Sequence, residues 1–264
     1  LRAEAGKLRI VATDLDMEMA ETIAADIAAA GDVTVPAHLL HDIARKLPDG
    51  AQVSCEASAD GKMLIRSGRA RFTLGTLPAS DFPTFAAGEM TTRFSMPAKT
   101  LRRLLATAQF AISDEETRYY LRGIFLHTLD VQNVTMLRAV ATDGHRLARL
   151  EATAPQGASG MPGIILPKKA VGEIVKLCEA QADAEVSIAV SATKFTFTIG
   201  AVELVSKLID GTFPDYQRVI PSGNDKRLVV DRDGFAQAVD RVSTISSERG
   251  RAVKMAVDAG KLTL

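Results

Sequence analysis

Residues 164–180 read IILPKKAVGEIVKLCEA, and residues 33–50 read VTVPAHLLHDIARKLPDG. Each stretch begins with a short apolar run that reaches a proline and continues with apolar residues at helical spacing. Pro36 and Pro167 lie 131 positions apart (167 − 36), and Pro83 and Pro214 are separated by the same interval (214 − 83). A period this long exceeds that of a solenoid repeat, so the sequence predicts duplicated domains.

The repeat extends in both directions from these prolines. VATD ends at Asp14 in the first copy and at Asp143 in the second (143 − 14 = 129). Residues 94–113, FSMPAKTLRRLLATAQFAIS, resemble residues 228–247, LVVDRDGFAQAVDRVSTISS, with Ser113 opposite Ser247. This second match predicts the start of a third copy near the end of the chain.

The matches predict three domains. We place them at 1–88, incomplete at its N-terminus, at 89–222, and at 223–264, which is the start of a third domain. Polar, turn-rich segments at 84–93 and 221–227 are the predicted linkers. Because the chain begins at Leu1 within a segment typical of a strand, we expect it to be part of a longer protein.

Each copy combines helices with strands. Apolar residues that recur on one face predict helices at 37–47, 97–112 and 168–179. The predicted buried faces are Leu40, Ile43 and Leu47; Leu101, Leu104, Leu105, Ala108 and Ile112; and Val171, Ile174, Val175 and Cys178. Aromatic and β-branched residues predict strands at 71–77, 123–129 and 195–199. Residues 17–30 are alanine-rich, which favours a helix, but their match to the segment after Asp143 leads us to predict a strand.

The composition limits the possible functions. Among 264 residues, 32 Lys and Arg balance 32 Asp and Glu, whereas a simple basic DNA-binding protein carries an excess of positive charge. Two cysteines are too few for a disulfide framework and favour the reducing cytoplasm. The sequence has no apolar run long enough to span a bilayer, so we expect no membrane partner.

The four histidines, His38, His41, His127 and His145, do not form a recognisable metal-binding pattern, and we expect no metal or cofactor. His145 and Asp143 together leave a hydrolase as an alternative hypothesis. The sequence has no G-x-S-x-G nucleophile motif and no phosphate-binding loop, so it gives that alternative little support.

Residues 139–150, AVATDGHRLARL, predict a β-hairpin. Residues 135–142 and 145–152 can pair across Asp143 and Gly144, because Asp-Gly suits a two-residue type I′ turn. The first copy continues after VATD with LDMEM and has no Gly, His or Arg there. Differences between duplicated domains indicate where a function has been added.

Three motifs together closely resemble the family of the bacterial DNA polymerase III β subunit, the β sliding clamps. They are VATDGHRLA (140–148), RYYLRGI (118–124) and KLIDGTFPDYQRVIP (207–221). TDLDMEM (13–19), MLIRSGRARFTLGTLPASDFP (63–83) and SERGR (247–251) agree with the family in order and spacing. The resemblance implies an α+β DNA-clamp fold of repeated domains, each with helices packed on antiparallel sheets.

The same resemblance implies a non-catalytic processivity factor of the replicative DNA polymerase. Two chains would close into a homodimeric ring around duplex DNA, without sequence specificity and without a cofactor. Such a ring can be acidic outside and basic inside, which accounts for the balanced charge. DNA polymerase III, other polymerases, the clamp loader and repair proteins would dock through short linear peptides.

Site residues follow from the matched motifs and from the polar helix faces. The implied peptide groove comprises Tyr120, Leu121, Thr142, Gly144, His145, Arg146, Leu147, Pro214, Arg218 and Val219. The candidate DNA-facing cations are Arg45, Lys46, Arg102, Arg103, Lys168 and Lys169. The implied dimer interface comprises Phe72 and Leu74 on one edge and Thr244 and Ile245 on the other.

Two alternatives remain open for these residues. The cations could equally form ordinary solvated helix faces, or serve a monomeric, non-specific DNA-binding module. The resemblance implies that Tyr119 and Tyr120 stack on unpaired template bases, whereas a half-buried place at a strand edge is the other interpretation.

Overall fold

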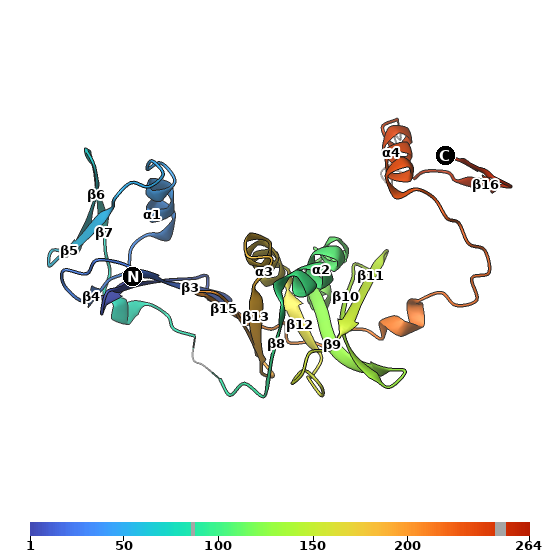
Figure 1. Ribbon diagram of the computed structural model, residues 1–264, viewed down its shortest axis with the longest axis horizontal. Helices are drawn as coiled ribbons and strands as arrows, with labels where there is room; N and C mark the ends of the chain where they lie inside the picture. The colour runs from blue at the N-terminus through green and yellow to red at the C-terminus, as the bar shows by residue number, and fades with distance from the viewer. Residues whose placement is uncertain (86–87, 246–251) are drawn as a thin grey trace. The chain divides into compact units, whose positions relative to one another are not determined.

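The computed structural model describes residues 1–85, 88–245 and 252–264. The chain divides into two compact units, Leu1–Pro214 and Asp215–Leu264. Ser247 and the SERGR motif lie outside the described residues. Figure 1 shows the helices and strands of both units, most of them labelled.

An eight-stranded sheet joins the first two sequence copies within the first unit. Its order is β4-β1-β2-β3-β15-β14-β13-β8. The strands are β1 (Arg2–Glu4), β2 (Lys7–Thr13), β3 (Met17–Ala24), β4 (Gly31–Asp32), β8 (Thr92–Pro97), β13 (Glu185–Val190), β14 (Lys194–Ile199) and β15 (Val202–Lys207). The copies meet where β3 pairs antiparallel with β15, with Val202 opposite Glu21. Backbone hydrogen bonds therefore run across the junction.

Two smaller sheets complete the first unit. The four-stranded sheet has the order β11-β10-β9-β12, and the three-stranded sheet has the order β5-β6-β7. Their strands are β9 (Gly123–Val131), β10 (Val134–Thr142), β11 (Leu147–Thr153), β12 (Ile164–Pro167), β5 (Ser54–Ser58), β6 (Lys62–Ser67) and β7 (Ala70–Gly75). Neighbouring strands in both sheets are antiparallel.

Prolines precede the three α-helices of this unit. Helices α1 (Ala37–Ala44), α2 (Ala98–Ala108) and α3 (Lys168–Ala180) follow Pro36, Pro97 and Pro167, each with φ of −61°. That φ is the value the proline ring imposes, and it suits a helix start. All three helices lie on the same side of the eight-stranded sheet (Figure 1). Helix α1 ends three residues earlier than predicted, and α2 continues as the 3₁₀ helix η2 (Gln109–Ala111).

The predicted apolar faces of α2 and α3 form the core, whereas Leu47 lies beyond the end of α1, is half-buried and belongs to neither core cluster. Leu101, Leu104 and Leu105 of α2 and Ile174 of α3 are fully buried, in one cluster with Phe197 of β14. In the first copy, Leu40 and Ile43 of α1 are only half-buried and pack on a small cluster of Met63, Ile65 and Leu74. The predicted strands at 71–77, 123–129 and 195–199 are β7, β9 and β14.

The alanine-rich segment at 17–30 is mostly strand. Residues 17–24 form strand β3 as predicted, although Ala25 to Ala30 lie outside it. Pairing with β2 and β15 outweighs the helical propensity of this alanine-rich segment.

The hairpin at 139–150 is confirmed, but the predicted two-residue turn is wrong. Thr142 pairs with Leu147, which leaves the four residues 143–146 in the loop.

The backbone angles explain this difference. A type I′ turn needs a positive φ at both central residues, and in this loop only Gly144 has one, at +90°. The neighbouring turn between β9 and β10 has that pattern instead. Gln132 and Asn133 have φ of +49° and +64°, and Val131 pairs with Val134.

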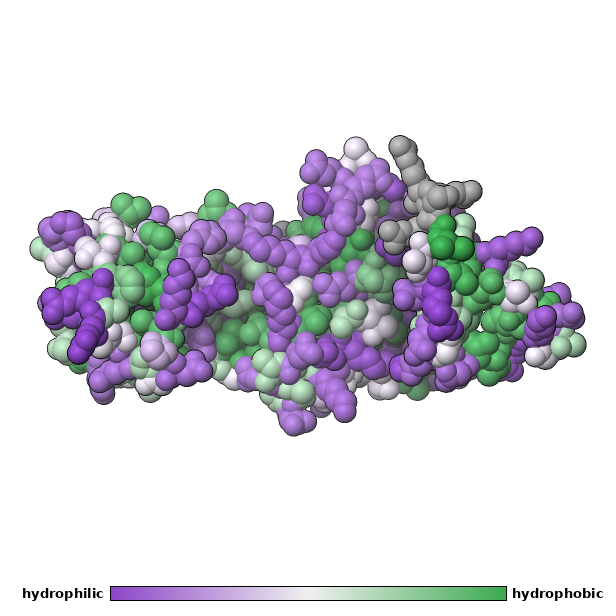
Figure 2. Space-filling view, turned by 90° about the horizontal axis from the view of Figure 1, so that it is seen from above, coloured by the Kyte–Doolittle hydropathy of each residue, from purple (hydrophilic) through white to green (hydrophobic). Residues whose placement is uncertain are grey.

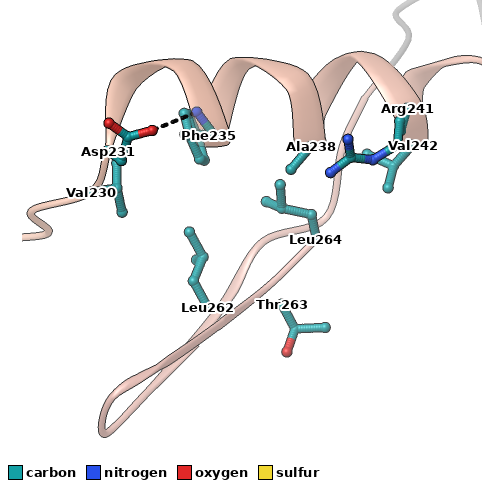
Figure 3. Close-up of a pocket in the computed structure, with 10 residues that line it drawn as sticks. Val230, Asp231, Phe235, Ala238, Arg241, Val242, Leu262, Thr263 and Leu264 are labelled. Carbon is teal, nitrogen blue, oxygen red and sulfur yellow. Dashed lines mark hydrogen bonds between the residues drawn. The ribbon is translucent and has the colours of Figure 1, made fainter.

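The second unit contains one α-helix and one hairpin among its described residues. They are α4 (Arg232–Ser243) and the pair β16 (Ala256–Asp258) and β17 (Lys261–Thr263). Asp231 begins the helix by accepting the Gly234 N–H at 2.7 Å. Phe235 and Val242 of α4 face Leu262 and Leu264 across a cavity of about 480 Å³ (Figure 3). Helix α4 starts 134 positions after α2 (232 − 98), as the match between the second and third copies predicts.

Candidate functional site

The loop after β10 is held by its own side chains. Thr142 Oγ1 donates to the Arg146 carbonyl at 2.8 Å and accepts the Gly144 N–H at 3.1 Å. Asp143 Oδ1 accepts the N–H groups of His145 and Arg146, both at 3.0 Å. Asp143 Oδ2 accepts from Arg146 Nε at 2.9 Å. These bonds fix the direction in which the loop presents its side chains.

The same bonds set the ionisation of Asp143. Burial raises the pKa of its carboxyl group, but hydrogen bonds from the N–H groups of His145 and Arg146 and from the Arg146 guanidinium lower it more strongly. The resulting pKa is about 2. Asp143 is therefore a carboxylate at neutral pH and accepts all of these bonds.

The first copy contains the same loop. Thr13 Oγ1 donates to the Met17 carbonyl at 2.8 Å and accepts the Leu15 N–H at 3.0 Å. Asp14 Oδ1 accepts the N–H groups of Asp16 and Met17, at 3.0 and 2.8 Å. Each bond corresponds to one in the second copy at an offset of 129 residues. The duplication inferred from the sequence thus extends to individual hydrogen bonds.

The two loops differ where a side chain from outside approaches. A Cβ atom at Gly144 would lie 2.4 Å from Arg118 Nη1. Arg118 Nη2 also donates to the Asp143 carbonyl at 3.1 Å, and its guanidinium pairs with Glu115. The corresponding position in the first copy is Leu15, with φ of +76°. Glycine in the second copy therefore makes room for Arg118, to which sequence reasoning gave no role.

Two predicted groove residues of this loop and the first residue of β11 reach solvent to different degrees. His145 is exposed, and the Arg146 side chain is 60% exposed. The Arg146 guanidinium lies 5.5 Å from the centre of the Phe110 ring, a cation–π contact. Leu147 is half-buried at the start of β11. Phe110 is 57% exposed and was also missed, because its place beside the loop depends on the fold rather than on a motif.

Tyr119, Tyr120 and Leu121 form the 3₁₀ helix η3 (Tyr119–Leu121). The tyrosine rings meet edge to face at 5.7 Å, and Tyr119 is 52% exposed. Gly211 lies against both of them, because a Cβ there would be 3.2 Å from Tyr120 Cβ and 3.3 Å from Tyr119 Cε2. Leu121 is only 3% exposed, so its side chain anchors this turn in the core.

The predicted groove residues beyond β15 fall in both units. Pro214 is exposed and follows Phe213, which is buried and stacks on Phe125 with 4.9 Å between ring centres. Arg218 and Val219 belong to the second unit, in the 3₁₀ helix η4 (Tyr216–Val219). Val219 is 68% exposed, and Arg218 pairs with Asp215 at 2.8 Å.

His127 lies on strand β9. It is half-buried, and its ring stacks on Phe125 at 4.6 Å. Burial lowers the pKa of His127. This packing agrees with a structural role for the residue.

The predicted DNA-facing cations lie on or near the helices. Figure 2 views the molecule from the side on which α2 and α3 lie and shows many hydrophilic side chains on that face. Arg102 pairs with Glu179 at 2.8 Å, and Lys168 pairs with Asp114 at 2.5 Å. Lys169 pairs with Asp14, and this hydrogen bond is the main cause that lowers the pKa of Asp14 to about 2.

Within the described residues, no carboxylate forms an ion pair with the other three predicted cations, Arg45, Lys46 and Arg103. Arg103 donates to the Glu151 carbonyl at 3.1 Å. Arg45 and Lys46 lie just after α1, are exposed, and have no ion pair within the described part of the chain.

The residues predicted for the dimer interface lie at two separate places. Phe72 and Leu74 are on β7, an edge strand of the three-stranded sheet. Leu74 is buried in the small core, whereas Phe72 is half-buried and lines a cavity of about 670 Å³. Thr244 follows α4 and donates to the Asp240 carbonyl at 3.1 Å, and Ile245 is 88% exposed.

The described residues contain neither a metal-binding cluster nor a membrane-spanning helix. Across residues 1–85, 88–245 and 252–264, no cluster of three or more His, Cys, Asp or Glu could hold a metal ion. None of the helices in those ranges is long and apolar enough to cross a membrane. Asp143 accepts the backbone N–H of His145, which is not the ring contact that a catalytic triad requires.

Comparison with known proteins gives a consistent result. Models of the DNA polymerase III beta subunit match residues 1–86 as its N-terminal domain, 95–215 as its central domain and 217–264 as its C-terminal domain. The beta sliding clamp of Caulobacter vibrioides is 50% identical over all of this chain and 71% of its own length. That of Pseudomonas aeruginosa is 38% identical over the same shares.

Solved structures agree with the sequence matches. A Caulobacter crescentus beta sliding clamp has a TM-score of 0.95 and 50% identity, covering 99% of this chain and 69% of that one. A Bartonella birtlesii sliding clamp bound to griselimycin has a TM-score of 0.93 and 52% identity, and the match covers 97% of this chain and 68% of that one. The predicted α+β clamp fold is thus confirmed.

These similarities define the class as the sliding clamps, which are polymerase subunits without catalytic activity. The chain belongs to the DNA polymerase III beta subunit family. Neither the hydrolase nor the monomeric DNA-binding module is favoured.

Proposed function

We propose that the complete protein forms a homodimeric ring around duplex DNA and holds DNA polymerase III on its template in the cytoplasm. Each chain would contribute three similar domains, divided in this sequence at 1–88, 89–222 and 223–264. The supporting observation is the duplicated loop, in which Asp14 and Asp143 accept equivalent hydrogen bonds, together with the sheet that joins the two copies edge to edge.

A continuous sheet with helices on one side suits an enclosing ring. Backbone hydrogen bonds between β3 and β15 extend one sheet across the junction of the two copies. Helices α1, α2 and α3 lie on one side of that sheet (Figure 1). Cations on those helices would meet phosphates inside the ring, while the remaining charges keep the net charge at zero.

We expect the affinity of the protein for DNA to be low. Contacts between cations and phosphates give non-specific dissociation constants of about 10⁻⁴–10⁻⁶ M at physiological salt. In our proposal, Arg45, Lys46, Arg102, Arg103, Lys168 and Lys169 supply these contacts. Retention would then depend on ring closure, while weak contacts permit sliding. Tyr119, whose ring is half exposed, and Tyr120 would stack on unpaired template bases.

A groove for linear peptides would lie beside the Asp143 loop. Leu147, Pro214 and Val219 would contact the apolar anchors of the peptide, and His145, Arg146 and Arg218 would form a polar rim. The rigid loop supports this role because it presents its side chains in a fixed direction. Two relatives bind griselimycin, which supports a ligand-binding surface on this fold. The remaining proposed groove residues are Tyr120, Thr142 and Gly144, and Leu121, whose side chain is buried, would support Tyr120 from the core.

Polymerase III, other polymerases, the clamp loader and repair proteins are the proposed peptide donors. The ring would close between the β7 edge, with Phe72 and Leu74, and the segment after α4 in the partner chain, with Thr244 and Ile245. Unpaired edge strands are ready to extend a sheet across two chains, which supports β7 as one side of this contact.

The function is tested by measuring polymerase product length on a primed single-stranded circle. With the clamp loader and ATP present, the complete protein should extend the products made in one binding event of the polymerase. Product length that does not change when the protein is added would contradict the proposal.

A further inference from the structure

Three of the candidate DNA-facing cations are each bound by a carboxylate from another part of the chain. Lys168 Nζ lies 2.5 Å from Asp114, and Arg102 Nη2 lies 2.8 Å from Glu179. Lys169 pairs with Asp14 of the first copy. In each pair the carboxylate is far from the cation in sequence, so the fold brings the two together.

Two of these carboxylates are well exposed. The side chains of Asp114 and Glu179 are 79% and 64% exposed, compared with 45% for Lys168 and 40% for Arg102. A phosphate that approaches either cation therefore also approaches its carboxylate. Asp14 differs because its other oxygen accepts two backbone N–H groups of its own loop, so a substitution there would alter more than this ion pair.

Ion pairing reduces the binding free energy that a DNA phosphate gains from contact with such a cation. A phosphate must displace or share the carboxylate, and the negative charge of the carboxylate opposes its approach. A cation that is already neutralised also holds fewer counterions to release, and counterion release drives non-specific binding. Paired cations thus contribute less affinity than free cations would.

We propose that Asp114 and Glu179 are charge-compensating residues that weaken the hold of the helix face on DNA and so help the ring to slide. This inference rests on the proposed function, in which Lys168 and Arg102 face the duplex. The function of the two carboxylates is to limit attraction, because a strong hold would slow movement along DNA.

The test uses the complete protein carrying Asp114→Asn together with Glu179→Gln. Both changes remove charge and keep side-chain size. The matched control is a double variant, Asp60→Asn with Glu56→Gln, which changes the net charge equally. Asp60, in the turn between β5 and β6, pairs with Lys62, and Glu56 of β5 pairs with Arg66 of β6. The three-stranded sheet that holds them lies apart from α2 and α3 (Figure 1).

Binding to a short linear duplex is measured by fluorescence anisotropy over a series of salt concentrations. The Asp114/Glu179 variant should bind several-fold more tightly than the unchanged protein. A plot of the logarithm of its association constant against the logarithm of salt concentration should have a slope that is steeper by up to about 1.8. Each of the two cations that become available would add ~0.9 to this slope. On long DNA, its one-dimensional diffusion should be slower. The control should show none of these changes.

Equal affinity and slope in the Asp114/Glu179 variant and in the control would overturn the inference. A further pair of substitutions, Lys168→Ala with Arg102→Ala, separates this result from failure of the proposed function. If these weaken DNA binding while removal of the carboxylates has no effect, only the compensation is wrong. If they also leave binding unchanged, the assignment of this face to DNA is wrong, and the inference fails with it.

Discussion

Asp14 and Asp143, 129 positions apart, accept the same pair of backbone hydrogen bonds in two copies of one loop. Each carboxylate binds the N–H groups two and three residues further along the chain. They differ in their third partner. Asp14 pairs with Lys169 of the next copy and so links two domains, whereas Asp143 pairs with Arg146 of its own loop. The same loop conformation therefore lies at the junction between two domains in the first copy and at a candidate binding surface in the second.

Substitution Gly144→Ala should weaken peptide binding. Its φ of +90° disfavours alanine, and the new Cβ would lie 2.4 Å from Arg118 Nη1. We expect displacement of the loop and a loss of about 1–3 kcal/mol in peptide affinity. Isothermal titration with a clamp-binding peptide measures this loss.

Gly160→Ala is the matched control for this substitution. Gly160 has φ of +75°, but no neighbouring atom lies within 4 Å of the Cβ position. It should therefore carry a similar backbone cost without loss of peptide affinity. Equal peptide affinity in the two variants would remove the Arg118 contact from the explanation.

The double substitution Leu147→Ala with Val219→Ala should also weaken the peptide, by at least ~1–3 kcal/mol, because both are proposed as apolar contacts for its anchors. Val134→Ala is a suitable control, since Val134 is an exposed residue at the other end of β10. Unchanged affinity in a folded double variant would exclude these two positions from the groove.

Leu101→Ala tests the core formed by α2. Leu101 is fully buried, so its truncation should lower the free energy of unfolding by about 2–5 kcal/mol. Leu39 on α1 is 52% exposed, and Leu39→Ala should change the free energy by about 0.5 kcal/mol or less. Urea unfolding followed by circular dichroism measures both. Similar midpoints for the two variants would contradict the assigned packing.

The low pKa of Asp143, about 2, predicts an acid-dependent loss of stability. The pKa of an aspartate in an unfolded chain is about 3.9. Because the folded value is lower, the ionised carboxylate stabilises the fold above about pH 4, and this contribution is lost as the pH falls towards about 2. Asp143→Asn should reduce the decline of unfolding free energy over that range.

Urea unfolding at several pH values tests this dependence. Asp49→Asn is the control, since Asp49 is exposed and has no ion pair in the described part of the chain. If Asp143→Asn and the unchanged protein lose stability in parallel between about pH 4 and pH 2, the carboxylate does not contribute in the way that its hydrogen bonds indicate.

The sequence predicts those features that depend on spacing along the chain. The 131-residue period and the prolines locate the copies and the starts of α1 and α3, and the apolar stripe on α2 identifies Leu101 and Leu104 as core. The match between copies also predicts β3, although alanine content alone favours a helix there.

Features that depend on distant contacts could not be predicted in this way. The loop after β10 has four residues instead of two because Asp143 binds the N–H groups of His145 and Arg146, and a dipeptide motif does not reveal this. Arg118 and Phe110 reach the loop only in the folded chain. The partners of the candidate DNA-facing cations were missed for the same reason.

The central claim is that the complete protein is held on DNA by enclosing it. The most direct measurement loads the protein onto a nicked circular plasmid, removes free protein by gel filtration, and then cuts the plasmid once. Enclosure predicts that the protein remains on the intact circle and leaves after the cut. Equal retention on the circular and the linear DNA would contradict it.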